Sequence, residues 1–178
     1  MNPVKSTCGK ACVARAYTLI EILVVVALLG VASALVIPNM SSTNVLRIQS
    51  TVRAIVSDIN CAQSDALALQ RGRAMVFDVE NNRYAIIEIP PDASTLDPMA
   101  NTLQTTDLRM STKFHDSKID SATFDGANVL YFDELGGTVT GPNSSTPSSG
   151  GTIIISGSGS RLQITVEAYT GRVTVSRI

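Results

Sequence analysis

The sequence has no tryptophan, a single histidine and few charged side chains. Aromatic residues make up only 4% of its 178 residues, which leaves few rings on which the bases of a single-stranded nucleic acid could stack. The formal net charge is −1, so no strong basic field is present to attract a polyanion. The composition therefore argues against a nucleic-acid partner.

The sequence also lacks a recognisable catalytic or metal-binding group of residues. His115 is followed by Asp116, but adjacency in sequence does not orient an imidazole for catalysis. Asp92, Asp97 and Asp107 are too widely spaced for a short calcium-binding loop. We therefore expect no enzymatic activity, no cofactor and no metal site.

Cysteine is scarce, with Cys8 and Cys12 in a short polar leader and Cys61 beyond it. The two leader cysteines have no histidine or further cysteine nearby and make a poor metal site. Loss of the leader would leave only Cys61, which cannot close an internal disulfide, so the exported domain must be held together by packing. We expect Cys61 to be a small buried side chain and not a reactive thiol.

Hydrophobic residues make up 44% of the chain and are concentrated between Tyr17 and Ile37. A helix of that length, at about 1.5 Å per residue, spans roughly 30 Å, the thickness of the hydrocarbon core of a bilayer. Lys5, Lys10 and Arg15 precede the run, and the first acidic residue is Glu21. Because positive charge favours the cytoplasmic side, the sequence predicts a single-pass membrane protein with a cytoplasmic N-terminus.

One acidic side chain, Glu21, interrupts the apolar run. A charged side chain in a membrane helix costs about 2.5–3.5 kcal/mol near the helix centre, so it needs a partner. The run contains no lysine, arginine or histidine, and the partner must therefore come from outside it. Cleavage of the chain after Ala16 would create a suitable group, the α-amine of Tyr17.

The segment from Ala16 to Gly30, AYTLIEILVVVALLG, resembles the class III signal of type IV pilins and type II secretion pseudopilins. The resemblance implies that a prepilin peptidase cuts between Ala16 and Tyr17 and methylates the amine of Tyr17. It implies that Glu21 meets the N-terminus of a neighbouring subunit during assembly, and that Gly30 and Pro38 loosen the helix. Ala16 replaces the usual glycine and Tyr17 the usual phenylalanine, and we still expect cleavage because alanine is the smallest substitute.

An ordinary secretory signal is the competing interpretation of the same segment. The small residues Ala32, Ser33 and Ala34 offer a signal-peptidase site after the apolar run, and cleavage there would release a soluble protein beginning at Leu35. The early position of Glu21 and the long basic leader oppose this interpretation. The first residue of the mature protein distinguishes the two.

Beyond Pro38 the apolar residues follow a three-four spacing, which predicts an amphipathic helix with one buried stripe. Residues 41–44 can cap its start, and Gly72 is a suitable end. The resemblance to pilins instead implies one long helix that bends at Pro38. The predicted stripe consists of Val45, Ile48, Val52, Ile55, Ile59, Ala62, Ala66 and Leu69.

After Ala74 the hydrophobic period changes to two, which predicts strands. A hairpin is expected across Asn81 and Asn82, because asparagine tolerates the positive φ of a tight turn. Residues 92–110 and 141–150 are polar and predict an exposed loop and a flexible surface loop. The expected strands are residues 74–79, 83–89, 128–133, 152–156, 161–167 and 172–177.

These elements predict an α+β, pilin-like fold: a long N-terminal helix, with a membrane half and an amphipathic half, packed on an antiparallel β-sheet meander. Residues 58–66, 71–76, 132–137 and 169–173 resemble the GspH/FimT group of minor pseudopilins. The expected divisions are a cleaved leader at residues 1–16, a transmembrane or filament-core helix at 17–38, and a periplasmic or extracellular domain at 39–178.

The function implied by the resemblance is that of a structural subunit of a type II secretion pseudopilus or a type IV pilus in the inner membrane. The implied partners are the prepilin peptidase, other pilins or pseudopilins in a helical filament, an inner-membrane assembly platform and membrane lipid. An alternative is a minor pilin whose loops at residues 92–110 or 141–150 bind a secreted substrate, a surface or DNA.

Overall fold

A computed structural model describes residues 17–36, 42–97, 101–110, 112–114, 116–157 and 159–178 of the chain. The chain divides into two units, residues 1–40 and 41–178, and each is described by itself. The first unit contains the helix α1, Leu19–Val36. The described residues of the second unit form the helix α2 and nine strands.

Helix α2, Ser42–Leu69, is the long helix of the second unit, and its apolar stripe is largely as the sequence predicts. Ile48, Val52, Ile55, Ile59, Ala62 and Ala66 are all buried. Thr51 is also buried, and its hydroxyl donates a hydrogen bond to Ser117 Oγ at 2.9 Å. The expectation for Leu69 is wrong, because its side chain is 57% exposed at the end of the helix.

The end of α2 lies earlier than the predicted stop at Gly72. Gln70 adopts a φ of 50°, and the amide of Arg71 donates to the carbonyl of Ala66 at 3.2 Å. This is a Schellman motif, the C-terminal cap in which one residue adopts the left-handed conformation and the next amide bonds to a carbonyl five residues earlier. Gly72 instead lies against Ile89, whose amide donates to its carbonyl at 2.9 Å.

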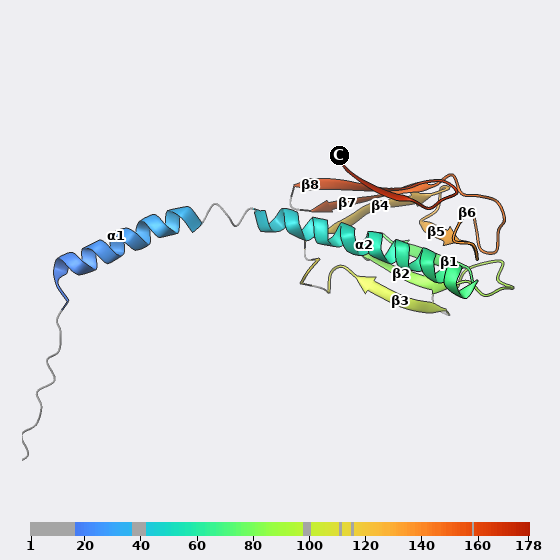
Figure 1. Cartoon of the computed structure of the whole chain (residues 1–178), viewed down its shortest axis with the longest axis horizontal. Helices are drawn as coiled ribbons and strands as arrows, with labels where there is room; N and C mark the ends of the chain where they lie inside the picture. Colours follow the sequence, from blue (N-terminus) through green and yellow to red (C-terminus); the bar gives the residue numbers. More distant parts are fainter. Residues whose placement is uncertain (1–16, 37–41, 98–100, 111, 115, 158) are drawn as a thin grey trace, which may run out of the picture. The chain divides into compact units, whose positions relative to one another are not determined.

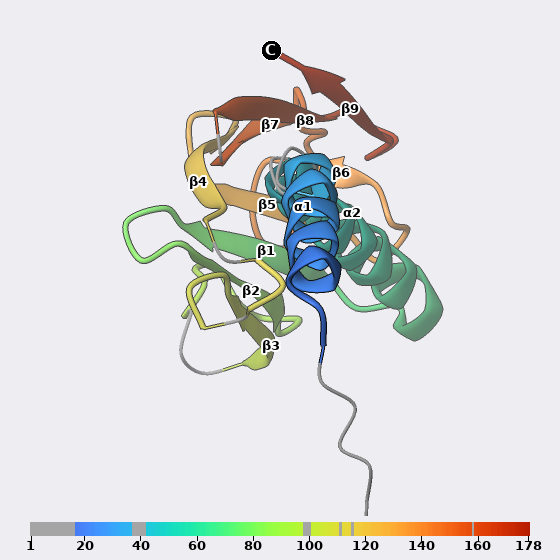
Figure 2. The same cartoon turned by 90° about the vertical axis from the view of Figure 1, so that its left-hand side faces the viewer.

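The strands form two antiparallel sheets on either side of α2 (Figures 1 and 2). One sheet has the order β3-β2-β1-β5-β6 and the other the order β4-β7-β8-β9. The α+β class and the helix packed on antiparallel strands are confirmed, while the expected meander is divided between two sheets. The strands are β1 Arg73–Asp78, β2 Arg83–Glu88, β3 Thr102–Asp107, β4 Lys118–Phe124, β5 Val129–Phe132, β6 Thr138–Val139, β7 Gly151–Gly157, β8 Ser160–Val166 and β9 Val173–Arg177.

Three of these strands are absent from the sequence-based expectation. Strand β3 lies within residues 92–110, for which the sequence predicts only a loop. It is a polar edge strand, TLQTTD, without an apolar face. Strand β4 has no clear sequence signal because its buried positions do not alternate strictly, and its register with β7 shifts between Ile119 and Ser121. Strand β6 has only two residues. In the first hairpin only Asn82 has a positive φ, of 52°.

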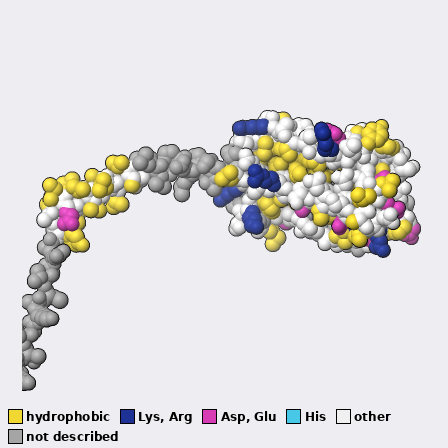
Figure 3. Space-filling view, in the orientation of Figure 1, with side chains coloured by type: hydrophobic (Ala, Val, Ile, Leu, Met, Phe, Trp, Pro, Cys, Tyr) yellow, Lys and Arg dark blue, Asp and Glu magenta, His cyan; other side chains and the backbone are white. Residues whose placement is uncertain are grey.

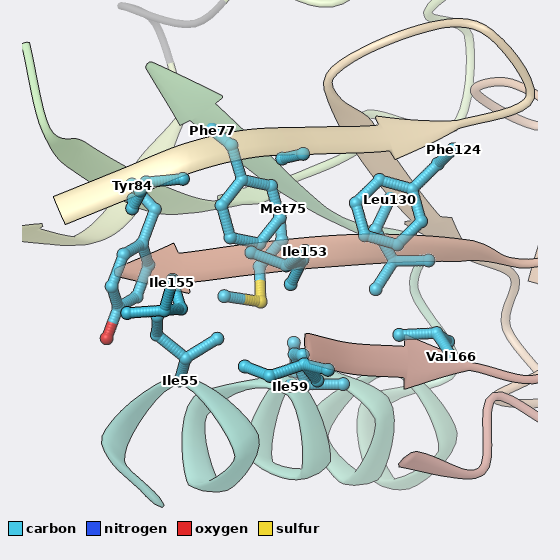
Figure 4. Close-up of a cluster of buried hydrophobic side chains, with 14 of the residues drawn as sticks. Ile55, Ile59, Met75, Phe77, Tyr84, Phe124, Leu130, Ile153, Ile155 and Val166 are labelled. Carbon is cyan, nitrogen blue, oxygen red and sulfur yellow. The ribbon is translucent and has the colours of Figure 1, made fainter. Parts of the chain in front are cut away.

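The core lies where α2 meets the inner faces of both sheets (Figure 4). Ile55 and Ile59 project from α2 toward Met75 of one sheet and Ile155 of the other. The Phe77 ring stacks on Phe124 with a centroid distance of 5.8 Å, so the two sheets share one core. Because the helix stripe and both sheets bury their apolar faces together, the second unit has a single hydrophobic core.

Candidate functional site

The start of α1 is the part of the described chain that carries the sequence-predicted assembly residue. Thr18 caps the helix: the amide of Glu21 lies 3.3 Å from Thr18 Oγ1 and 3.1 Å from the Thr18 carbonyl. Thr18 and Glu21 thus occupy the N-cap and N3 positions of a capping box. A carboxylate in the first turn also interacts favourably with the helix dipole. Glu21 therefore has a local role in starting the helix.

Helix α1 carries apolar side chains on every face, and all residues from Tyr17 to Ser33 are exposed. The helix passes through Gly30, where an added Cβ would have no neighbour within 4 Å. Ser33 Oγ donates to the Leu29 carbonyl at 2.7 Å, a contact that often bends helices. Among the described residues, no helix meets the length and hydropathy expected of a membrane span.

The structure describes three of the predicted site residues of this segment, Tyr17, Glu21 and Gly30. Tyr17 is 75% exposed and precedes the helix, and Glu21 is exposed one turn into it. Ala16 and Pro38 lie outside the described residues, as does His115. Cleavage before Tyr17, its methylation and the pairing of Glu21 with another subunit stay predictions.

A second cluster, which we call the Gln63 junction, joins three of the segments that carry the resemblance to minor pseudopilins. It consists of Gln63, Gly136, Thr170 and Gly171. Gln63 Nε2 donates to the Gly136 carbonyl at 2.7 Å and to the Thr170 carbonyl at 2.8 Å. One side chain of α2 therefore holds two turns that lie far apart in the sequence.

The two turns are shaped for this contact. Asp133 Oδ1 accepts hydrogen bonds from the amides of Leu135 and Gly137, at 3.0 and 2.7 Å, and so closes the first turn. Gly136 and Gly171 have φ values of 76° and 66°, in the left-handed region that glycine enters without steric cost. A Cβ on Gly171 would lie 3.0 Å from Gln63 Nε2 and 3.1 Å from the Phe132 ring. Sequence reasoning identified these turns but not the side chain that joins them.

Replacing Gly171 with alanine should lower the free energy of unfolding by about 2–4 kcal/mol, through left-handed strain and crowding at the junction. The matched control is Gly126→Ala, because Gly126 has a φ of 85° but nothing within 4 Å of an added Cβ. The free energy of unfolding of that variant should fall by only about 1–2 kcal/mol, because it suffers backbone strain without crowding. Denaturant unfolding of both variants measures the difference, and equal losses would show that the junction is not closely packed.

The segment from Gly141 to Gly150 is held more firmly than its composition predicts. Asn143 Nδ2 donates to the carbonyls of Pro90 and Ala93, each at 2.9 Å. Asp125 accepts hydrogen bonds from the hydroxyls of Ser148 and Ser149, and these bonds hold the pKa of Asp125 below its usual value. These contacts attach the segment near both of its ends, which its composition of Gly, Pro and Ser does not indicate.

The expectation for Cys61 is also wrong, because the structure places it on the exposed face of α2. It directly precedes Ala62 of the buried stripe, and a step of one residue along a helix turns the side chain by about 100°.

Tyr84, by contrast, is buried against α2 and donates to Asp58 Oδ2 at 2.7 Å. Burial, reinforced by the nearby carboxylate, raises the pKa of Tyr84 above its ordinary range. Within the described part of the chain, no group of three His, Cys, Asp or Glu side chains is arranged to hold a metal ion.

Comparison with known proteins gives one family match and several structural ones. The family described as type II transport protein GspH matches residues 51–171. No curated protein matches the chain in sequence. The fold is similar to that of the type IV minor pilin FimU of Pseudomonas aeruginosa, with 17% identity and a TM-score of 0.50, over 72% of this chain and 87% of that one. The minor pseudopilin EpsH of Vibrio cholerae, from its type 2 secretion system, is 13% identical with a TM-score of 0.49, over 74% of this chain and 97% of that one.

Proposed function

This chain belongs to the GspH family of type II transport proteins, and from that premise we propose that it is a minor pseudopilin or minor pilin. Its work is that of a structural subunit in a type II secretion pseudopilus or a type IV pilus. The observation that carries the proposal is the family match over residues 51–171. The α2 and two-sheet domain agrees with it in fold.

In the proposed pathway the chain is first inserted in the inner membrane by residues 17–38, with its globular domain in the periplasm. A prepilin peptidase then cuts between Ala16 and Tyr17 and methylates the new amine. The apolar surface of α1 on every face supports this part of the proposal, because such a helix must be covered either by lipid or by other helices. Gly30 and Pro38 are proposed to let the helix adjust as it leaves lipid for the filament.

Glu21 is proposed to guide assembly. Its backbone amide takes part in the cap formed by Thr18, while its carboxylate lies in the first turn of α1, where it favours the helix dipole, and is exposed to a partner. In the filament its proposed partner is the N-terminal amine of a neighbouring subunit. A buried pair of this kind stabilises the assembly only while both charges are present.

The proposed role is structural and not enzymatic, and its partners are other pilins or pseudopilins, the peptidase and an assembly platform in the inner membrane. The Gln63 junction fits a structural role, because it fixes the shape of the domain around α2. A subunit that must fit between neighbours needs such a fixed shape.

Recovery of the chain in filaments tests the proposal. Filaments sheared from cells that express the assembly machinery are separated from membranes and medium, and the chain is detected in each fraction. We expect it in the filament fraction of cells with the prepilin peptidase and only in the membrane fraction of cells without it. Recovery as a soluble protein in both strains would contradict the proposal.

A further inference from the structure

We infer that the end of the globular domain where α2 begins docks on an anionic phospholipid surface. This inference rests on the proposed function, which supplies a bilayer beside the domain. The docking surface, here called the basic end, is defined by five side chains: Arg47, Lys113, Lys118, Arg161 and Arg177.

Side-chain contacts bring the first part of the basic end together. Arg47 Nη1 lies 3.3 Å from Asp116 Oδ2, and Ser50 Oγ donates to the Lys113 carbonyl at 3.1 Å. The segment that leads into β4 therefore lies against the first turns of α2. Lys118 begins β4 directly after this segment.

Sheet register adds the remaining two residues. Lys118 pairs with Ser156 of β7, and Ser156 pairs in turn with Arg161 of β8. Leu162, beside Arg161, pairs with Arg177 of β9. The residues at the start of β4, the start of β8 and the end of β9 thus lie at the same end of this sheet. Figure 3 shows most of the Lys and Arg side chains in view gathered at the end of the domain where α2 begins.

The acidic side chains are distributed in the opposite way. The domain contains more acidic than basic residues, and Figure 3 shows most of those in view away from the basic end. The end of α2 and the turns around it carry Asp65, Glu88, Asp133, Glu134 and Glu167.

The basic end also contains acids, and most of them are paired. Asp116 and Asp120 form ion pairs with Arg47 and Arg161. On the neighbouring strands and turns, Asp78 pairs with Arg83 and Asp107 with Arg109, while Glu80 lies exposed in the turn after β1. Among the described residues, Lys118 and Arg177 are exposed and have no ion-pair partner. The basic end therefore keeps an excess of positive charge.

Exposed aliphatic side chains accompany this charge. Leu46, beside Arg47, is 62% exposed, and the terminal Ile178 is 57% exposed. The amide of Ile178 donates to the Arg161 carbonyl at 3.2 Å, and this hydrogen bond holds Ile178 at the same end of the sheet. Basic side chains mixed with exposed aliphatic ones are the combination that binds the interface of anionic membranes.

The course of the chain favours lipid over an acidic protein as the occupant. The chain enters the domain at Ser42, the first residue of α2, and only five residues separate Ser42 from Val36 of the apolar helix α1. The basic end is thus the end of the domain that directly follows the proposed membrane segment in sequence. Lipid headgroups around that segment would therefore be only a few residues along the chain from the basic end.

Energy transfer on reconstituted vesicles tests the docking with the full chain. Cys8→Ser and Cys12→Ser leave the exposed Cys61 as the one thiol for a donor dye, and acceptors are attached to lipid headgroups. Cys61 follows Arg47 by about 21 Å along α2, so docking brings the donor within range of the acceptors. Transfer is compared on phosphatidylcholine vesicles and on equal mixtures of phosphatidylcholine and phosphatidylglycerol, at low and molar salt.

We expect strong transfer only on the anionic vesicles at low salt, because salt screens exposed charges. Each basic side chain at the surface raises the ratio of docked to undocked domains about fivefold. The double variant Lys118→Gln, Arg177→Gln should therefore lower that ratio roughly 25-fold. The matched control Arg172→Gln removes an exposed arginine that pairs with Glu167, away from the basic end, and should leave the ratio unchanged.

Flotation of the same samples separates this inference from the proposed function. Equal transfer on both vesicle types, from a chain that floats with both, would overturn the docking and leave the membrane anchor in place. A chain that floats with neither contradicts the anchor and the docking together. Unchanged transfer in the double variant, accompanied by poorer recovery in filaments, would assign the basic end to a protein neighbour and overturn the inference.

Discussion

Replacing Ala16 with phenylalanine is expected to abolish processing of the chain. The residue before the cut is usually glycine in proteins with this signal, and alanine adds only a methyl group to it. A phenyl ring at the same place would obstruct the approach of the peptidase to the bond before Tyr17. The unprocessed chain should keep its 16-residue leader, which an immunoblot of membranes detects as a larger product.

Two further variants serve as controls for Ala16→Phe. Ala14→Phe adds the same ring two residues before the site and should be processed normally, so it controls for added hydrophobicity in the leader. Ala16→Gly should be processed at least as fast as the natural chain. Normal processing of Ala16→Phe would place the cleavage elsewhere.

Replacing Glu21 with alanine is expected to leave processing intact but to lower incorporation into filaments strongly. Removing one member of a buried ion pair costs about 3–5 kcal/mol, because the other charge stays buried without a partner. A loss of that size corresponds to at least roughly a hundredfold lower incorporation. The ratio of the chain in sheared filaments to the chain in membranes measures it.

Glu21→Gln separates the two roles of this side chain. Glutamine also serves at the N3 position of a capping box, so the variant retains the local cap with Thr18 and loses only the charge. If pairing with an amine drives assembly, Glu21→Gln should fail as severely as Glu21→Ala. Normal incorporation of Glu21→Gln would mean that Glu21 acts only as a helix cap.

The helices were more predictable from the sequence than the sheets. The buried stripe of α2 follows from spacing alone, because Ile48 to Ala66 repeat with the helical period and meet one core. The errors at Leu69 and Cys61 have different causes: the apolar pattern does not show where the covering sheets end, which decides Leu69, whereas Cys61 lies one residue before the stripe residue Ala62 and so faces away from the core. The polar edge strand β3 could not be found from hydrophobic alternation, since its residues cover no core.

The candidate site was predictable only where it depends on local sequence. The residues around the Gly136 and Gly171 turns were recognisable as motifs, and their positive φ values suit glycine. Their connection through Gln63 depends on how α2 packs against turns more than seventy residues away, and no local pattern encodes it. The capping of α1 by Thr18 follows from the local Thr18 to Glu21 spacing, although the pilin-like signal drew attention to Glu21 alone.

The N-terminal peptide of the chain, isolated from its native membranes and weighed by mass spectrometry, tests the central claim most directly. The account predicts a peptide that begins at Tyr17 and is heavier than its sequence by the mass that a single methylation adds. A peptide that begins at Leu35 would identify an ordinary secretory signal, and one that retains the leader would exclude processing. Either result would contradict assembly through a free amine at Tyr17.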